Sequence, residues 1–202
     1  MNDNKNLFAC FEELINQGVD PAARSADIWD RYGTEVAVLV LDSTGFSRVS
    51  ESHGIIHFLT RLMQMRQLVR PILEAHQALR ARFEADNAFA AFPHPDLAIK
   101  AALEIHQAMT LSDIMLTESE AFRVCIGIGY GRMLYSETLE GYFSEEMNIA
   151  SKLGEDTAEG GETLLTASAW NAADESLKHQ FQPRALKISG LELTYYLNTT
   201  DS

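Results

Sequence analysis

Two aspartates stand where a carboxylate could do chemistry. Asp42 follows the apolar run Val36–Leu41, which is typical of a buried strand, and Asp86 lies in the short turn of a predicted β-hairpin. If the strand and the hairpin are neighbours in one sheet, the two carboxylates converge at its edge and raise each other's pKa. Magnesium, which is typically held by one or two carboxylates plus substrate phosphates, would remove that cost. A metal site and two ordinary turns explain these residues about equally, because Asp is also common in turns.

The residues directly after Asp42 form a candidate anion site. Ser43, Thr44, Gly45 and Phe46 make a turn that leads into a helix. Backbone N–H groups at such a turn would point out of the strand end and suit the β- and γ-phosphates of a nucleotide. The same residue types also make ordinary turns.

An amide and a cation stand one helical turn apart later in the chain. Asn148 and Lys152 are four residues apart in a segment with helical periodicity, so we expect them on one face of a helix. They could hold a ribose and a phosphate there, or they could belong to a solvated helix face.

The hydrophobic pattern indicates the elements that position these residues. Helical spacing predicts helices over 55–76, with a bend at Pro71, over 95–109 and over 145–159. Strands are predicted over 36–41, 79–84, 87–92, 121–134 and 162–166, and again around Gly190 near the end of the chain. The order β-α-β-β-α-β is that of a ferredoxin-like, palm-type α+β domain with a mixed sheet and helices on one face.

The N-terminal part has a different pattern. Apolar residues from Leu7 to Ile15 recur at helical spacing, Gly18 ends the run, and a segment with a proline and small residues follows. We therefore divide the chain into a helical extension with a linker, residues 1–27, and a main domain, residues 28–202.

Composition and charge narrow the class of protein. The chain has 202 residues and a net charge of −13, which argues against a nucleic-acid-binding surface, since such surfaces are basic. An acidic chain that binds a triphosphate must concentrate its few cations, or use metal ions, at one place. No apolar run approaches the length of a membrane span and no secretory signal is visible, so the cytoplasm is the expected compartment.

Four segments together resemble the catalytic domain of class III nucleotidyl cyclases. They are "VLVLDSTGFS", "RARFEADNAFAAF", "FRVCIGIGYGRML" and "EGYFSEEMNIASKL". They follow the order of the family pattern: a strand that ends in Asp before Gly-Phe-Ser/Thr, a hairpin with a second Asp, a glycine-rich strand, and a helix of the form Asn-x-Ala-x-Arg. The resemblance runs from about residue 28 to the end of the chain.

The resemblance implies a function and a partner. Members of the family form head-to-tail dimers with sites at the interface, and they convert a nucleoside triphosphate to a 3′,5′-cyclic nucleotide and pyrophosphate. It implies that Asp42 and Asp86 bind two Mg²⁺ or Mn²⁺ ions, which activate the ribose 3′-hydroxyl and hold the triphosphate. In the partner protomer, Asn148 would orient the ribose and Lys152 would stabilise the transition state.

The chain departs from the family pattern at four positions. Lys152 stands in place of the transition-state Arg and lacks its bidentate fork. Ala85 replaces the usual Gly before the second metal-binding Asp. Arg82 stands in place of a purine-reading Lys, and Gly141 in place of the second base-reading residue. Glu84 shares a strand face with Arg82, so it is either paired with Arg82 or solvated.

Two functional hypotheses follow. The first is a homodimeric cyclase that uses a nucleoside triphosphate, with ATP as the default from family frequency. The second is a catalytically silent cyclase-homology domain that binds nucleotide or signals by dimerisation. Asp42, Asp86 and Asn148 favour the first, and Gly141 and Lys152 favour the second. A diguanylate cyclase is disfavoured because its Gly-Gly-Asp/Glu-Glu-Phe run is missing.

Overall fold

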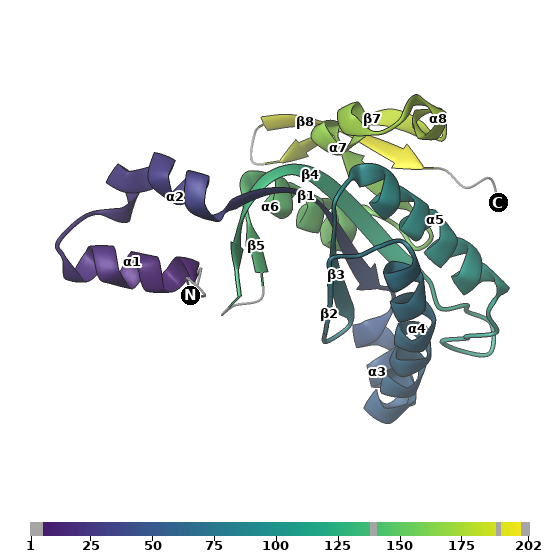
Figure 1. The fold of residues 1–202 in the computed structure, drawn as a ribbon. Helices are drawn as coiled ribbons and strands as arrows, with labels where there is room; N and C mark the ends of the chain where they lie inside the picture. Colours follow the sequence, from purple (N-terminus) through teal and green to yellow (C-terminus); the bar gives the residue numbers. More distant parts are fainter. Residues whose placement is uncertain (1–5, 138–140, 189–190, 199–202) are drawn as a thin grey trace.

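One mixed sheet organises the chain (Figure 1). The computed structural model describes residues 6–137, 141–188 and 191–198. The sheet has eight strands in the order β2-β3-β1-β4-β6-β8-β7, with β5 paired to β4, and every pair is antiparallel except β4–β6. The strands are β1 Gly33–Ser43, β2 Arg80–Glu84, β3 Asn87–Phe92, β4 Val124–Ser136, β5 Gly141–Phe143, β6 Thr163–Thr166, β7 Phe181–Ile188 and β8 Leu191–Asn198. The predicted α+β class and mixed sheet are confirmed.

The structure has eight α-helices and two short helical turns among its described residues, and some helices begin at a capping side chain. They are α1 Leu7–Asn16, α2 Ser25–Tyr32, α3 Phe46–His53, α4 Ile55–Ala75, α5 Pro95–Leu111, α6 Glu145–Ser151, α7 Ala167–Ala172 and α8 Glu175–Lys178, with a 3-10 turn η1 at Pro21–Arg24 and a π-helical turn η2 at Lys152–Thr157. The Ser144 hydroxyl, for example, accepts from the Met147 N–H and starts α6. None of the described helices is long and apolar enough to cross a membrane.

Alternate residues of β1 face two separate cores. Ala37, Leu39 and Leu41 belong to the main core, which buries residues of α4, α5 and α7. Val36, Val38 and Val40 point the other way and pack with Ala150 of α6. Helices therefore cover both faces of the sheet, whereas the sequence led us to expect them on one face. The physical reason is that β1 is apolar on both sides, as expected of a central strand.

The N-terminal segment is helical beyond α1. Residues 19–27, interpreted as linker from the sequence, include η1 and the start of α2. Leu7, Ile28 and Tyr32 form a small third core that Leu134 of β4 also contacts, so α1 and α2 pack beside the end of β4 and β5 (Figure 1). The division at residue 28 stays a prediction. Gly190, expected between the last two strands, lies outside the described residues.

A close approach between two glycines fixes α6 and η2 against the sheet. The expected helix 145–159 changes to π-helical geometry at Lys152, where Gly154 passes directly over Gly127 of β4. A Cβ on Gly127 would lie 2.1 Å from the Ala150 carbonyl oxygen and 2.6 Å from the Gly154 nitrogen. Backbone cannot move away from such a contact as a flexible side chain could. The glycine pair thus brings residues 152–157 to the end of β1.

The contact predicts a large difference between two glycines of the same strand. Gly127→Ala should destabilise the fold by about 1–3 kcal/mol, the usual cost of overpacking. Gly131→Ala is the matched control, since its Cβ would meet only the Glu146 side chain, at 3.5 Å. Thermal unfolding of the two variants measures the difference, and equal melting temperatures would contradict the packing.

Candidate functional site

The strand register brings Asp42 and Asp86 together. Leu41 of β1 is paired with Ala88 of β3, so Asp42 follows at the point where the β2–β3 turn reverses the chain. The turn consists of Ala85 and Asp86, as the sequence predicted, because Glu84 and Asn87 close the hairpin. The two aspartates of the prediction are therefore neighbours at one edge of the sheet.

The electrostatics of this edge are strongly anionic. The pKa of Asp42 is raised from 3.8 to about 6, first by burial, then by repulsion from Asp86, with smaller contributions from Glu155 and Asp156 of η2 and an opposing backbone hydrogen bond from Ser43. Burial and the same two neighbours, Asp156 and Asp86, also raise the pKa of Glu155. No cation is among the groups that shift these two pKa values in the described part of the chain. The edge therefore has four carboxylates and no internal counter-ion that acts on Asp42.

This donor set fits a divalent cation that is shared with a substrate. Among the described residues, no group of three or more His, Cys, Asp or Glu side chains is arranged to hold a metal alone. Two carboxylates without their own counter-ion are nevertheless the usual protein contribution to Mg²⁺ sites whose other ligands are phosphates and water. Asp42 and Asp86 would be those ligands.

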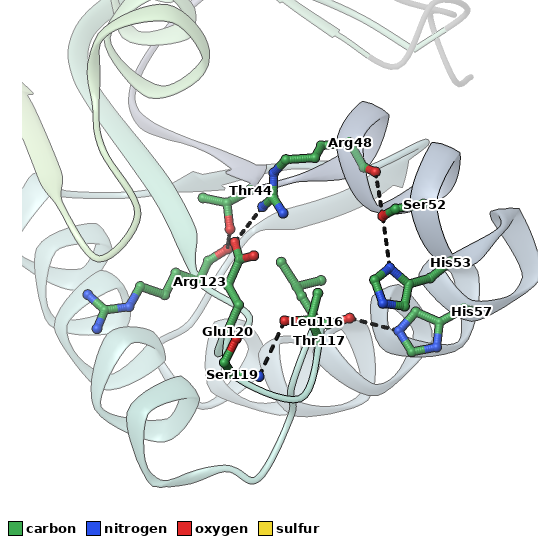
Figure 2. A network of polar contacts seen from close by, with 10 residues as sticks. All are labelled: Thr44, Arg48, Ser52, His53, His57, Leu116, Thr117, Ser119, Glu120 and Arg123. Atoms are coloured by element: carbon green, nitrogen blue, oxygen red, sulfur yellow. Dashed lines mark hydrogen bonds and ion pairs between the residues drawn. The ribbon is translucent and has the colours of Figure 1, made fainter.

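The turn after Asp42 is held by its neighbour strand rather than left open. The Thr44 N–H and hydroxyl both donate to the Arg123 carbonyl, at 3.1 and 3.0 Å (Figure 2). The sequence led us to expect four outward-pointing amides, and this one is instead used internally. Ser43 is buried in β1, whereas Gly45 has a φ of +84° and directly precedes α3, whose first turn has no side-chain cap among the described residues. The candidate anion site is therefore reduced to the amides at Gly45 and Phe46.

The segment 112–123 fixes this turn from the outside. Arg48 of α3 forms an ion pair with Glu120 at 2.5 Å, and a ring nitrogen of His57 in α4 donates to the Leu116 carbonyl at 2.8 Å (Figure 2). Together with the bonds to the Arg123 carbonyl, these contacts anchor the start of α3 and α4 to one loop. The amides at Gly45 and Phe46 are thus placed before any ligand arrives.

A cavity of about 550 Å³ brings the two predicted base-reading positions together. Arg82 and Gly141, distant in sequence, both line it. Val38 also lines it, and the two-residue period of β1 puts Val38 and Asp42 on the same face of the sheet. Arg82 pairs with Glu84 at 3.0 Å, which decides between the two alternatives left open for Glu84.

The cavity also contains residues that the sequence did not single out. Arg80 lies over the Tyr135 ring at 4.5 Å and interacts with the Tyr142 hydroxyl, while Arg82 lies over Phe89 at 5.3 Å. Arg80 and Arg82 are two residues apart in β2 and share one face of the strand, so the sequence alone could have identified Arg80. Tyr142 belongs to β5, a three-residue strand without a usable pattern. Cationic N–H donors and aromatic rings can both contact a planar base.

Asn148 and Lys152 are one turn apart, as expected. The Lys152 N–H donates to the Asn148 carbonyl, and both side chains are exposed on the surface. Lys152 begins η2 and its ammonium lies 3.4 Å from Asp156. Glu155 and Asp156 are the other residues that sequence reasoning missed, because only the π-helical turn directs them toward Asp42.

The raised pKa of Asp42 predicts how stability depends on pH. The folded state binds the Asp42 proton more tightly than the unfolded state, so this stabilisation is present below about pH 4 and is lost as the pH rises through about 6. Asp42→Asn stays neutral throughout. The variant should therefore melt roughly 2–4 °C above the natural protein at pH 8 without divalent ions, a shift typical of about 1 kcal/mol.

The same comparison near pH 4 is the control, because Asp42 is then protonated in the folded protein and most of the difference should disappear. Addition of Mn²⁺ at pH 8 should raise the melting temperature of the natural protein more than that of Asp42→Asn. A difference in melting temperature that does not change with pH would contradict the anionic cluster.

Comparisons with known proteins place the fold. No protein-family model and no curated protein matches the chain in sequence. In structure it is similar to an adenylate/guanylate cyclase/hydrolase from Silicibacter pomeroyi, with a TM-score of 0.70, 20% identity, and 84% of this chain and 98% of that chain covered.

Two guanylate cyclase domains are also similar. That of RhGC from Catenaria anguillulae, in complex with GTP, has a TM-score of 0.67 and 18% identity, over 82% of this chain and 96% of that one. The non-canonical dimeric domain of the RhoGC fusion protein from the aquatic fungus Blastocladiella emersonii has a TM-score of 0.67 and 17% identity, over 82% of this chain and 97% of that one. At such low identity the likeness establishes the fold. The chain has the fold of adenylate and guanylate cyclase catalytic domains, as its resemblance to the class III family predicts.

Proposed function

We propose that the chain is a nucleotidyl cyclase that converts a nucleoside triphosphate into a 3′,5′-cyclic nucleotide and pyrophosphate. The observation that carries this proposal is the juxtaposition of Asp42 and Asp86 beside the amides at the start of α3, within a cyclase fold. Carboxylates for a divalent cation and amides for phosphate oxygens are what a metal–triphosphate substrate requires.

The two aspartates and the start of α3 would hold the substrate's phosphates. Asp42 and Asp86 would hold two Mg²⁺ or Mn²⁺ ions per site, which would supply the charge that neutralises the triphosphate and lowers the pKa of the ribose 3′-hydroxyl. Ser43 and Thr44 fix the backbone of the turn, and Gly45 and Phe46 offer their N–H groups to the phosphates. The Arg123 backbone carbonyl accepts both hydrogen bonds from Thr44, while its guanidinium donates to the Gly160 carbonyl.

The active site would be shared between two copies of the chain. Within one copy the groups that shift the pKa of Asp42 are anionic or backbone, and the exposed Asn148 and Lys152 are not among them. A second copy, placed head to tail, could bring its Asn148 to the ribose and its Lys152 to the reacting phosphate. The similar domain from Blastocladiella emersonii is described as a non-canonical dimer, so the proposed head-to-tail arrangement rests on the resemblance to the class III family.

The base would occupy the cavity with Arg82 and Gly141. Glycine has no side chain to read a base, and an arginine offers five N–H donors and no acceptor. Arg80 and the Tyr142 hydroxyl add further polar groups. ATP is the proposed substrate by family frequency, and the cavity provides donors that the acceptors of either purine could use.

A silent cyclase-homology domain is the second candidate function. Lys152 lies near Asp156 of its own chain, and Gly141 leaves one base-reading position without a side chain. Such a domain would bind nucleotide or pair with a partner without turnover. The activity assay that follows separates the two.

A complementation experiment tests the shared site. The purified protein with Mn²⁺ should form a cyclic product from ATP, and Asp42→Ala and Asn148→Ala should each be inactive. When the two inactive variants are mixed, a heterodimer has one intact site and one site lacking both groups, so about a quarter of the natural activity should return with random exchange of subunits.

Two controls accompany this mixture. Asp42→Ala mixed with Asp86→Ala should stay inactive, because every site would then lack one aspartate. Subunit exchange is followed separately with fluorescently labelled chains. Exchange without any recovery of activity would refute the shared site, and a natural protein that binds nucleotide without turnover would favour the silent domain.

The base cavity predicts weak discrimination between purines. A site that lacks a dedicated hydrogen-bond partner for one group rejects an analogue far less than the ~10⁴-fold that such a partner can give. We expect kcat/KM for ATP and GTP to differ by less than about 100-fold. Gly141→Asp should raise the preference for ATP, because its carboxylate can accept from the 6-amino group of adenine.

Gly141→Ala is the matched control, since it adds a side chain without an acceptor. A very large ATP preference in the natural protein that Gly141→Asp leaves unchanged would show that other groups in the cavity, with Arg80 and Tyr142 first among them, read the base.

A further inference from the structure

The turn that carries Asp86 is strained at the residue before it. Ala85 has a φ of +47°, and among the described non-glycine residues only Gln77 shares a positive φ. A positive φ at the first residue alone of a two-residue hairpin turn is the pattern of type II′, where glycine is strongly preferred. A Cβ in this region costs roughly 1–2 kcal/mol. The Asp86 turn must therefore be held by something beyond its own residues.

An arginine of α4 contacts this turn. The Arg66 guanidinium donates a hydrogen bond to the Ala85 carbonyl and lies over the Phe83 ring at 5.6 Å. None of the ion pairs between described residues includes Arg66. Its hydrogen bond is thus directed at a backbone carbonyl rather than at a carboxylate.

The carbonyl that Arg66 binds controls the backbone of Asp86. It belongs to the peptide between Ala85 and Asp86, and turns of types II′ and I′ differ by the orientation of that peptide. Rotation of the peptide would change the φ of Asp86, which can adopt positive values, and would redirect its carboxylate. A bond to the carbonyl oxygen opposes this rotation.

We propose that Arg66 is a positioning residue that holds the Ala85–Asp86 turn, and thereby the Asp86 carboxylate, in the orientation that binds a divalent cation. The claim that Asp86 binds a cation rests on the proposed function, whereas the claim that Arg66 holds the turn does not. Groups that orient metal-binding carboxylates typically change metal affinity by 10–100-fold when removed.

Binding of Mn²⁺ to the full-length protein, measured by calorimetry without nucleotide, tests the proposal. Arg66→Ala should bind Mn²⁺ at least about 10-fold more weakly. Simple electrostatics predicts the opposite sign, because removal of a positive charge near a cation site tightens binding. A weaker affinity therefore identifies positioning, and an unchanged or tighter affinity would overturn it.

Arg70→Ala is the matched control. Arg70 lies one helical turn further along α4 and over the same Phe83 ring, at 4.7 Å, but no described hydrogen bond joins it to the turn. Its loss removes the same charge and a similar ring contact, so Mn²⁺ affinity should stay within about twofold. An equal loss of affinity in both variants would assign the effect to Phe83 packing and contradict the proposal.

Glycine at position 85 provides a rescue. In the double variant Arg66→Ala/Ala85→Gly the turn adopts its positive φ without strain, so at least half of the lost affinity, on a logarithmic scale, should return. A double variant as weak as Arg66→Ala alone would show that Arg66 does not act through the turn.

The holding of the turn is tested separately in EDTA. Arg66→Ala should lower the melting temperature more in the natural background than in the Ala85→Gly background, and additive shifts would refute the coupling. If the natural protein binds no Mn²⁺, or if Asp42→Ala binds it equally well, the proposed metal site is wrong. The melting temperatures of the single and double variants in EDTA still decide whether Arg66 holds the turn.

Discussion

Repulsion between carboxylates at the end of β1 is the constraint on which the site depends. Asp42 loses hydration on folding and faces Asp86, Glu155 and Asp156, so its charged form is disfavoured. The antiparallel register of β1 and β3 brings in Asp86, and the contact between Gly127 and Gly154 brings in η2. The same packing that builds the core thus gathers carboxylates where binding of a divalent cation is favourable. None of the groups that shift the pKa of Asp42 is a cationic side chain.

Two arginines on the Asp42 face of the sheet are held away from Asp42. Arg80 and Arg82 lie in the cavity between the β2–β3 hairpin and β5, each over an aromatic ring. If Arg80 or Arg82 contacted Asp42, its positive charge would neutralise the carboxylate and compete with a metal ion. In a chain of net charge −13, this separation gives one region suited to a metal–phosphate group and another suited to a polar, planar base.

Sequence periodicity was sufficient for the long elements and for the proximity of Asp42 and Asp86. The hairpin turn at Ala85–Asp86, the strand before Asp42 and the helix 55–76 all follow from patterns of several residues. Two short elements were not predicted, because β5 has only three residues and η2 differs from an α-helix only in its backbone hydrogen bonds. The use of the Thr44 amide by the Arg123 carbonyl also could not be foreseen, since it depends on the register between segments 79 residues apart.

The departures from the family pattern are not equivalent to lost function, as Lys152 illustrates. Its contact with Asp156 at 3.4 Å joins residues four apart, and both side chains are largely exposed. Exposed pairs of this kind contribute only about 0.3–0.5 kcal/mol, which is small beside the attraction of a triphosphate for a cation in a partly buried site. In the proposed shared site, Lys152 could therefore leave Asp156 at little cost when a substrate binds across two chains. Asp156, freed of its partner, would then add its full negative charge to the edge that holds Asp42, and the affinity of that edge for a divalent cation would rise when the partner's site engages its phosphates.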